Sequence, residues 1–112
     1  MTRLPAAVEA TGVIRRAQAA GDFAAVIRRG DPDRGAIMLL VTQRGQHLAC
    51  LERTLAPDGN YRWQRVGPGE GAEADQLRDF LARRARFDED SWLIELDIAD
   101  GERFIAETTL EG

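Results

Sequence analysis

The sequence predicts an α+β fold in which two main helices pack with one mixed sheet. Two segments with helical spacing of apolar residues, 4–20 and 72–86, lie far apart in the chain. Between them, three short connections separate four apolar segments, which is typical of a four-strand antiparallel meander. A strongly alternating segment after the second helix predicts a fifth strand, placed by a crossover of that helix over the sheet. The same order of elements also fits an α/β classification.

The length and composition indicate one soluble globular domain over residues 1–112, with 44% hydrophobic and 30% charged residues. The longest apolar run, 36–41, is too short to cross a membrane. The first residues lack the apolar stretch of a signal peptide. The single cysteine cannot form an internal disulfide, which indicates a reducing compartment. We therefore expect a cytoplasmic protein without contact to a membrane.

The first helix is predicted over Leu4–Ala20, where small apolar residues recur every three or four positions. Pro5 suits the first turn of this helix, and Gly21 suits the position just past its end. Because the apolar stripe is mostly alanine, the helix should approach its partner closely. The stripe consists of Ala6, Ala10, Val13, Ala17 and Ala20.

The meander is predicted from four segments with strand-like patterns. They are Phe23–Ile27, Ala36–Val41, His47–Arg53 and Tyr61–Val66. The connection over 31–35 is dense in turn formers and predicts a hairpin between the first two strands. The pair Asp58-Gly59 is the strongest hairpin signal in the chain. The unbroken apolar run 36–41 favours a central strand with cover on both faces of the sheet.

The second half of the chain contains the clearest helix and the clearest strand. The helix is predicted over 72–86, with an inward face made of Leu77, Phe80, Leu81 and Ala85. Its first turn is acidic and its last turn is rich in arginine, as the helix dipole favours. Alternation over 92–98 predicts a half-buried strand. Residues 102–108 fit either an edge strand or a short helix.

The chain carries few reactive side chains. It has no lysine, and it has a single histidine, cysteine, serine and tyrosine, which are His47, Cys50, Ser91 and Tyr61. Nucleophilic and acid–base sites draw on several such groups within hydrogen-bond reach. His47 and Cys50 are three apart in one strand, so alternation would send them to opposite faces. The acidic run 88–90 lacks partners for a cation. We expect no catalytic residues, no metal site and no cofactor.

The segment 64–69 carries the one motif that suggests a small ligand. It has a Gln-x-x-Gly-x-Gly spacing between a strand and a helix, and it resembles, in that spacing alone, the pyrophosphate loop of acetyl-coenzyme-A-dependent N-acetyltransferases. Pro68 removes a donor, and Glu70 and Glu73 would repel a phosphate, so a plain strand-to-helix turn is favoured. The alternative is a small ligand-binding protein or acyl-CoA-type transferase. Its candidate binding residues are Arg62, Arg65, Gly67, Gly69 and Gly71.

Charge and aromatic content favour a protein partner over a nucleic acid. The net charge is −4 and the acids are spread among the arginines, which disfavours counterion-driven binding to nucleic acid. Aromatic side chains on strands suit a dimer contact, and the candidates are Tyr61, Trp63 and Trp92. The leading hypothesis is a non-enzymatic module that binds itself, as a homodimer, or an unidentified protein. A weak nucleic-acid binder is a further alternative.

Much of the chain resembles one known family. The stretch 15–31, continuing to 35–36, and the stretch 81–95 are similar to small alphaproteobacterial proteins grouped as domain of unknown function 1491. Trp63 before the Gly-Pro turn fits as well, and the Arg-Phe-Asp-x-Asp-x-Trp run is the most specific part. Ser91 stands where the family pattern has leucine. The resemblance implies no activity, cofactor or catalytic residue.

Overall fold

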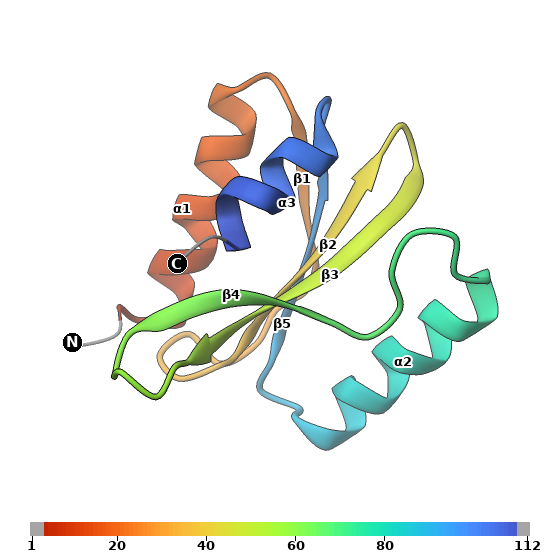
Figure 1. Ribbon diagram of the computed structural model, residues 1–112. Coiled ribbons are helices and arrows are strands. Elements are labelled where there is room, and N and C mark those ends of the chain that lie inside the picture. The colour runs from red at the N-terminus through yellow and green to blue at the C-terminus, as the bar shows by residue number, and fades with distance from the viewer. Residues whose placement is uncertain (1–3, 110–112) are drawn as a thin grey trace.

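The computed structural model describes residues 4–109 and shows one five-stranded sheet with helices on both of its faces (Figure 1). In chain order, the elements are α1 (Ala6–Ala19), β1 (Phe23–Arg28), β2 (Ile37–Gln43), β3 (Gln46–Leu55), β4 (Tyr61–Val66), α2 (Ala74–Phe87), β5 (Trp92–Asp97) and α3 (Gly101–Thr109). The helices and strands predicted from the sequence are all present, with ends shifted by a few residues at most.

The strand order in the sheet is β1-β5-β2-β3-β4. Strands β2, β3 and β4 form an antiparallel meander, and β1 is antiparallel to β5. Strand β5 runs parallel to β2, as expected for a strand reached by a crossover. The predicted class, an α+β fold with a mixed sheet and one crossover strand, is confirmed.

The predicted hairpin between β1 and β2 is the one pairing that differs. Strand β5 lies between them, and the connection 31–35 bridges over its first residues. The backbone N–H of Asp31 donates to the carbonyl of Asp90 (2.8 Å), and that of Trp92 donates to the carbonyl of Ala36 (2.7 Å). The chain therefore does turn over 31–35, as predicted, but this connection passes over β5 and joins two strands that are not neighbours in the sheet.

Two glycines make room for this insertion. A Cβ atom at Gly30 or at Gly35 would overlap the carbonyl oxygen of Asp90 and press on the indole ring of Trp92. The connection can therefore close around the start of β5 only because both positions lack a side chain.

The main core lies between the sheet and the pair α1 and α3. Helix α1 contacts β1 and β5, and α3 contacts β2, β3 and β4. Both helices lie on the face of the sheet that carries the buried core side chains of β2 and β5. The sheet contributes Ile37, Leu39, Val41, Leu51, Trp63, Trp92, Ile94 and Leu96, and the helices contribute Ala6, Ala10, Val13, Ala17 and Ile105. As predicted, the alanine stripe of α1 is the buried face of that helix.

Residues 101–109 form a helix, which decides between the two alternatives left by the sequence. Ile105 is fully buried, and Phe104 packs against the same core. The backbone N–H of Gly101 donates to Oε1 of Gln43 at 2.8 Å, and a Cβ at Gly101 would overlap the side chain of Leu48. The start of α3 is thus set directly on the β2–β3 hairpin.

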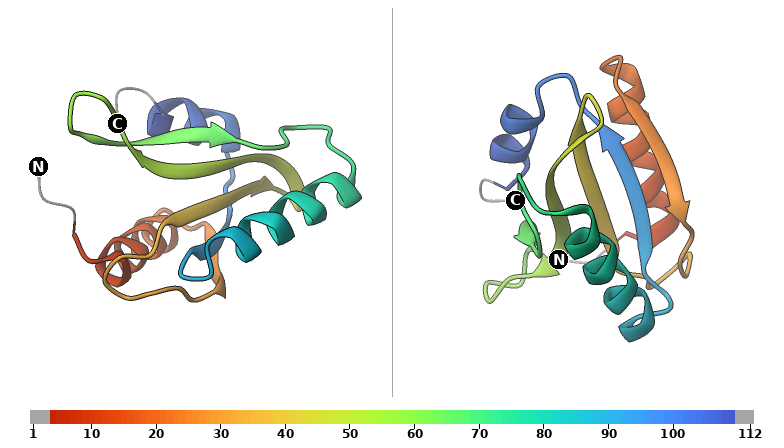
Figure 2. Two further views of the ribbon diagram at one scale, coloured as in Figure 1. Left: turned by 90° about the horizontal axis from the view of Figure 1, so that it is seen from below. Right: turned by 90° about the vertical axis from the view of Figure 1, so that its right-hand side faces the viewer.

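Helix α2 lies on the opposite face of the sheet, and Figure 2 (right) shows it in front of the strands with α1 behind them. This arrangement matches the expectation of cover on both faces. The cover is thin, since none of the described residues 74–87 is buried. The inward residues predicted from the sequence are only half-buried: Leu77, Phe80, Leu81 and Ala85.

Candidate functional site

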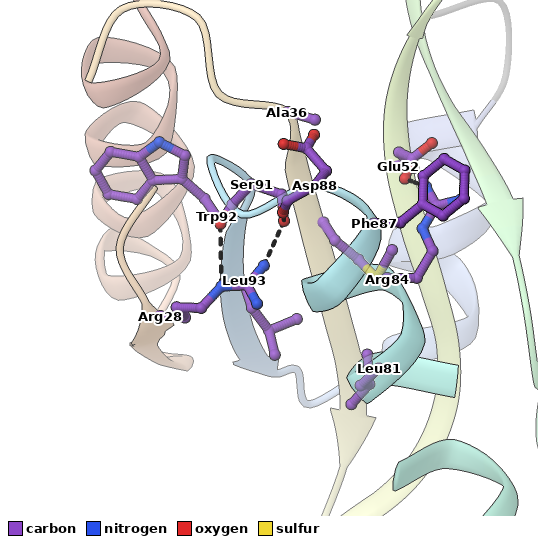
Figure 3. A pocket seen from close by; sticks show the side chains of 11 residues that line it. Arg28, Ala36, Glu52, Leu81, Arg84, Phe87, Asp88, Ser91, Trp92 and Leu93 are labelled. Atoms are coloured by element: carbon purple, nitrogen blue, oxygen red, sulfur yellow. Dashed lines mark hydrogen bonds and ion pairs between the residues drawn. The ribbon is translucent and has the colours of Figure 1, made fainter. Parts of the chain in front are cut away.

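A pocket of about 200 Å³ lies between the C-terminal half of α2 and the sheet (Figure 3). We call it the α2 pocket. Its residues come from the end of β1, the starts of β2 and β5, the middle of β3 and one side of α2. They are Arg28, Ala36, Met38, Glu52, Leu81, Arg84, Phe87, Asp88, Ser91, Trp92 and Leu93. The pocket is thus bounded by segments that are distant in the sequence.

One wall of the α2 pocket is an ion pair between Arg84 of α2 and Glu52 of β3. The guanidinium of Arg84 also lies over the ring of Phe80, 5.9 Å from its centre. Cys50 is fully buried on the same face of β3. Burial raises the pKa of the Cys50 thiol to about 11, and the charge of Arg84 opposes that rise. The thiol is therefore protonated near neutral pH and is a poor nucleophile.

The opposite wall is formed by Arg28 at the end of β1. Its Nε donates to the carbonyl oxygen of Ser91 at 3.2 Å, and its terminal nitrogen donates to the Ser91 hydroxyl. The Ser91 hydroxyl donates in turn to the carbonyl of Asp88 (2.8 Å). These contacts hold the guanidinium at the junction of β1 and β5. Both of its acceptors are uncharged, so these hydrogen bonds do not neutralise the positive charge of Arg28.

Phe87 is the last residue of α2. It lies at the mouth of this pocket and is 94% exposed. A large aromatic side chain left in water at a helix end gains nothing for the monomer. It marks the α2 side of this face as an exposed apolar feature.

The neighbouring edge of the sheet, β1, is also apolar. Strand β1 pairs with β5 alone among the described strands, so its other side carries unpaired backbone groups. Phe23 and Ile27 are 57% and 54% exposed, and Val26 is exposed as well. The opposite edge, β4, carries exposed polar side chains instead, with Gln64 and Arg65. The two edges therefore differ sharply in chemistry.

The residues predicted as a ligand loop do not gather into one site. The β3–β4 register pairs Arg62 with Thr54 and Arg65 with Leu51, which places the two arginines on opposite faces of the sheet. Arg62 is already engaged by Asp58, with 2.6 Å between nitrogen and oxygen. The two arginines thus cannot act together on one anion.

Of the glycines in that loop, only Gly67 is required by side-chain packing. Gly67 has a positive φ of 63° and lies against the ring of Phe80, where a Cβ would overlap it. Gly71 also has a positive φ, of 85°, whereas Gly69 has only a backbone oxygen at 4.0 Å near its missing Cβ. At the start of α2, the Glu73 side chain accepts from the helix backbone in a capping box. A carboxylate of the chain itself therefore occupies the place a phosphate would need.

The expectation that His47 and Cys50 lie on opposite faces is wrong. A β-bulge at Leu48 makes His47 the partner of Thr42 and Cys50 the partner of Leu40, so both lie on the same face. Even so, they show no sign of a catalytic pair. The Nε2 of His47 donates to the carbonyl of Pro68 at 2.9 Å, and the thiol is held protonated as described above.

The aromatic residues predicted for an interface are mostly internal. Trp92 is 2% exposed and donates through Nε1 to the carbonyl of Asp31 at 2.8 Å. Trp63 is buried in the main core, and Tyr61 is half-buried beside Arg53, whose guanidinium lies 6.0 Å from its ring centre. The two tryptophans therefore stabilise the fold and are not available for a surface contact.

Two further features are absent from residues 4–109. No group of three or more His, Cys, Asp or Glu among the described residues, the acidic run 88–90 included, is arranged to hold a metal ion. No described helix is long and apolar enough to cross a membrane.

The comparisons with known proteins agree on one family. A family model described as "Protein of unknown function (DUF1491)" matches residues 4–106. A crystal structure of a DUF1491 family protein from Caulobacter crescentus is 29% identical, with a TM-score of 0.77, covering 91% of this chain and 94% of that chain. A solution structure from A. tumefaciens is 28% identical, with a TM-score of 0.71 and 86% of each chain covered. No curated protein matches.

Proposed function

This chain belongs to the DUF1491 family of proteins of unknown function, and on that premise we propose that it is a non-enzymatic interaction module that pairs with a second copy of itself. The contact is the free edge of β1. Two copies of β1 run antiparallel to each other, and the two sheets become one continuous sheet across a two-fold axis.

The observation that carries this proposal is the apolar edge of β1, which none of the other described strands covers. Proteins usually protect an edge strand with charges, proline or a covering element, because its unpaired backbone groups recruit other strands. Over 23–27, β1 has no charged residue and no proline, and Phe23 and Ile27 are more than half exposed. Its protection is limited to a bulge between Val26 and Arg28.

A second copy is the occupant favoured by symmetry and by charge. A strand that pairs antiparallel with its own copy presents the same surface on both sides, as a two-fold interface requires. The apolar side chains of 23–27 then cover each other. The guanidinium of Arg28, the last residue of the strand, is bonded to Ser91, and the exposed Arg29 falls at the rim of the contact, where water reaches it. The edge of β4, with its exposed Arg65, would instead bring like charges together.

The poverty of reactive groups supports a binding role over catalysis. Burial keeps the Cys50 thiol protonated, and His47 is engaged with the backbone of the β4–α2 loop. A single buried cysteine also accords with a cytoplasmic location, which is part of this proposal.

Sedimentation velocity at increasing protein concentration tests the proposal. We expect the unaltered chain to form a dimer in the micromolar range and Phe23→Lys to shift it to a monomer. Leu55→Lys is the matched control, since Leu55 is 59% exposed at the end of β3, away from β1. A monomer at all concentrations for the unaltered chain, or loss of the dimer in Leu55→Lys with Phe23→Lys unaffected, would overturn it.

A further inference from the structure

The α2 pocket combines an apolar lining with a guanidinium that has no acidic partner among residues 4–109. Six of its eleven lining residues are apolar: Ala36, Met38, Leu81, Phe87, Trp92 and Leu93. Pockets that bind small molecules are mostly apolar and carry a few polar groups that fix the ligand's orientation. The volume of about 200 Å³ is below the range of drug-sized ligands, so the matching molecule is small.

The charges that line the pocket do not cancel around Arg28. Glu52 and Arg84 form an ion pair with each other. The Asp88 carboxylate accepts the backbone N–H of Asp90 at 3.1 Å, and Figure 3 shows it directed toward Ala36 and away from the guanidinium of Arg28. Within the described chain, Arg28 forms no ion pair. Its contacts are the two uncharged acceptors of Ser91.

This guanidinium is held in place and still has capacity to bind. A guanidinium has more N–H donors than the two that Ser91 engages. Because Arg28 is only half exposed and lies beside apolar side chains, an anion there would be weakly screened by water. The planar arrangement of its donors matches the two oxygens of a carboxylate.

From these features we propose that the α2 pocket binds a small monocarboxylate with an apolar body. The carboxylate lies on the guanidinium of Arg28, and the apolar body lies against Leu81 and Leu93 under the end of α2. This site does not depend on pairing through β1. It also gives a role to Phe87, whose exposed ring stands at the mouth of the pocket and can close over the ligand.

The chemistry favours a carboxylate over a phosphate ester. One guanidinium supplies a single positive charge, which balances a monocarboxylate. A phosphate group with up to two negative charges would also face the carboxylates of Glu52 and Asp88, which line the same pocket. The helix N-termini that usually bind phosphates are not part of this pocket.

A titration followed by the backbone amide signals in ¹H–¹⁵N spectra tests this site. The probe is 3-phenylpropionate, and its matched control is 3-phenylpropanamide, which has the same shape without the charge. We expect the carboxylate to shift signals of residues 28, 81, 91 and 93 and to bind at least about tenfold more tightly than the amide. Because this comparison uses the unaltered chain, it does not depend on any variant folding.

Variants then test whether Arg28 supplies the positive charge that binds the carboxylate. Arg28→Gln should weaken binding of 3-phenylpropionate about tenfold. Arg83→Gln removes an exposed arginine from α2 outside the pocket and should change the affinity less than about twofold. The proposal is overturned by equal binding of acid and amide, by shifts that lie elsewhere, by an unchanged affinity in Arg28→Gln, or by no binding at about 10 mM probe.

Discussion

The ring of Phe80 in α2 lies directly against the backbone of Gly67, the first residue after β4. This contact matters because α2 has no fully buried side chain. Together with the ion pair between Arg84 and Glu52, it fixes how the helix sits on the sheet. Position 67 combines a positive φ of 63° with a ring at the place of a Cβ, so it tolerates only glycine.

Gly67→Ala should therefore lower the free energy of unfolding by about 2–3 kcal/mol, through backbone strain and displacement of the Phe80 ring. Gly71→Ala is the matched control, because Gly71 has a similar φ of 85° and open space around its missing Cβ. That change should cost only about 1 kcal/mol. Urea denaturation measures both. Equal losses in the two variants would mean that Phe80 does not press on position 67.

The insertion of β5 between β1 and β2 leads to a second prediction. Gly35→Ala would place a methyl group into the carbonyl of Asp90 and the indole of Trp92, so we expect a loss of about 3 kcal/mol or more. Gly69→Ala, with its nearest neighbouring atom at 4.0 Å and no positive φ, should cost less than about 1 kcal/mol. Thermal unfolding followed by circular dichroism compares them. A mild effect at position 35 would contradict the close approach seen there.

Local pattern was sufficient to predict the elements of this fold except α3, which it left open between strand and helix, and it did not determine the order of the strands in the sheet. Alternation in β5 and the alanine stripe of α1 were visible in the sequence because each is a short-range signal. The hairpin over 31–35 was predicted wrongly because turn formers show where a chain reverses and do not show what lies between its arms. The available signal was the pair Gly30 and Gly35. Glycines on both sides of a turn indicate that another segment of the chain approaches its backbone closely.

The candidate site depended even more on long-range contacts. Sequence motifs drew attention to the loop at Gly67, whose glycines prove to accommodate Phe80 and tight turns. Arg28 and Leu81 are 53 positions apart, and only the folded chain shows that they line one pocket. The face shared by His47 and Cys50 depends on a bulge at one residue, which strict alternation cannot foresee.

The raised pKa of Cys50 predicts an unreactive thiol. Burial raises this pKa from 9.0 to about 11, so the folded chain at pH about 8 holds roughly a hundredfold less thiolate than an exposed cysteine would. Alkylation by iodoacetamide, followed by mass spectrometry, should be at least about a hundredfold slower in the native protein than in urea. Rapid labelling of the native protein would contradict the burial of the Cys50 thiol.

The hydrogen bonds to the Asp97 carboxylate predict that the free energy of unfolding falls in acid. Its carboxylate accepts the backbone N–H groups of Gly45 (2.9 Å) and Arg44 (3.1 Å) and the hydroxyl of Thr42 (3.1 Å). The bond from Gly45 is the main cause that lowers the pKa of Asp97 below its ordinary 3.8. A lowered pKa stabilises the fold above pH 3.8, and this contribution is lost as the pH falls through the folded value. The free energy of unfolding should thus fall less steeply with acid in Asp97→Ala than in Glu89→Ala, an exposed control.

Hydrogen exchange of the β1 amides tests the central claim, pairing through this edge, most directly. The N–H groups of residues 23–27 that point away from β5 are free in a single copy and bonded in a pair. We predict that their exchange slows when the protein concentration rises from about 10 µM to about 1 mM, while exchange in the edge strand β4 stays unchanged. Exchange in β1 that does not depend on concentration, or slowing in β4 instead, would contradict the account.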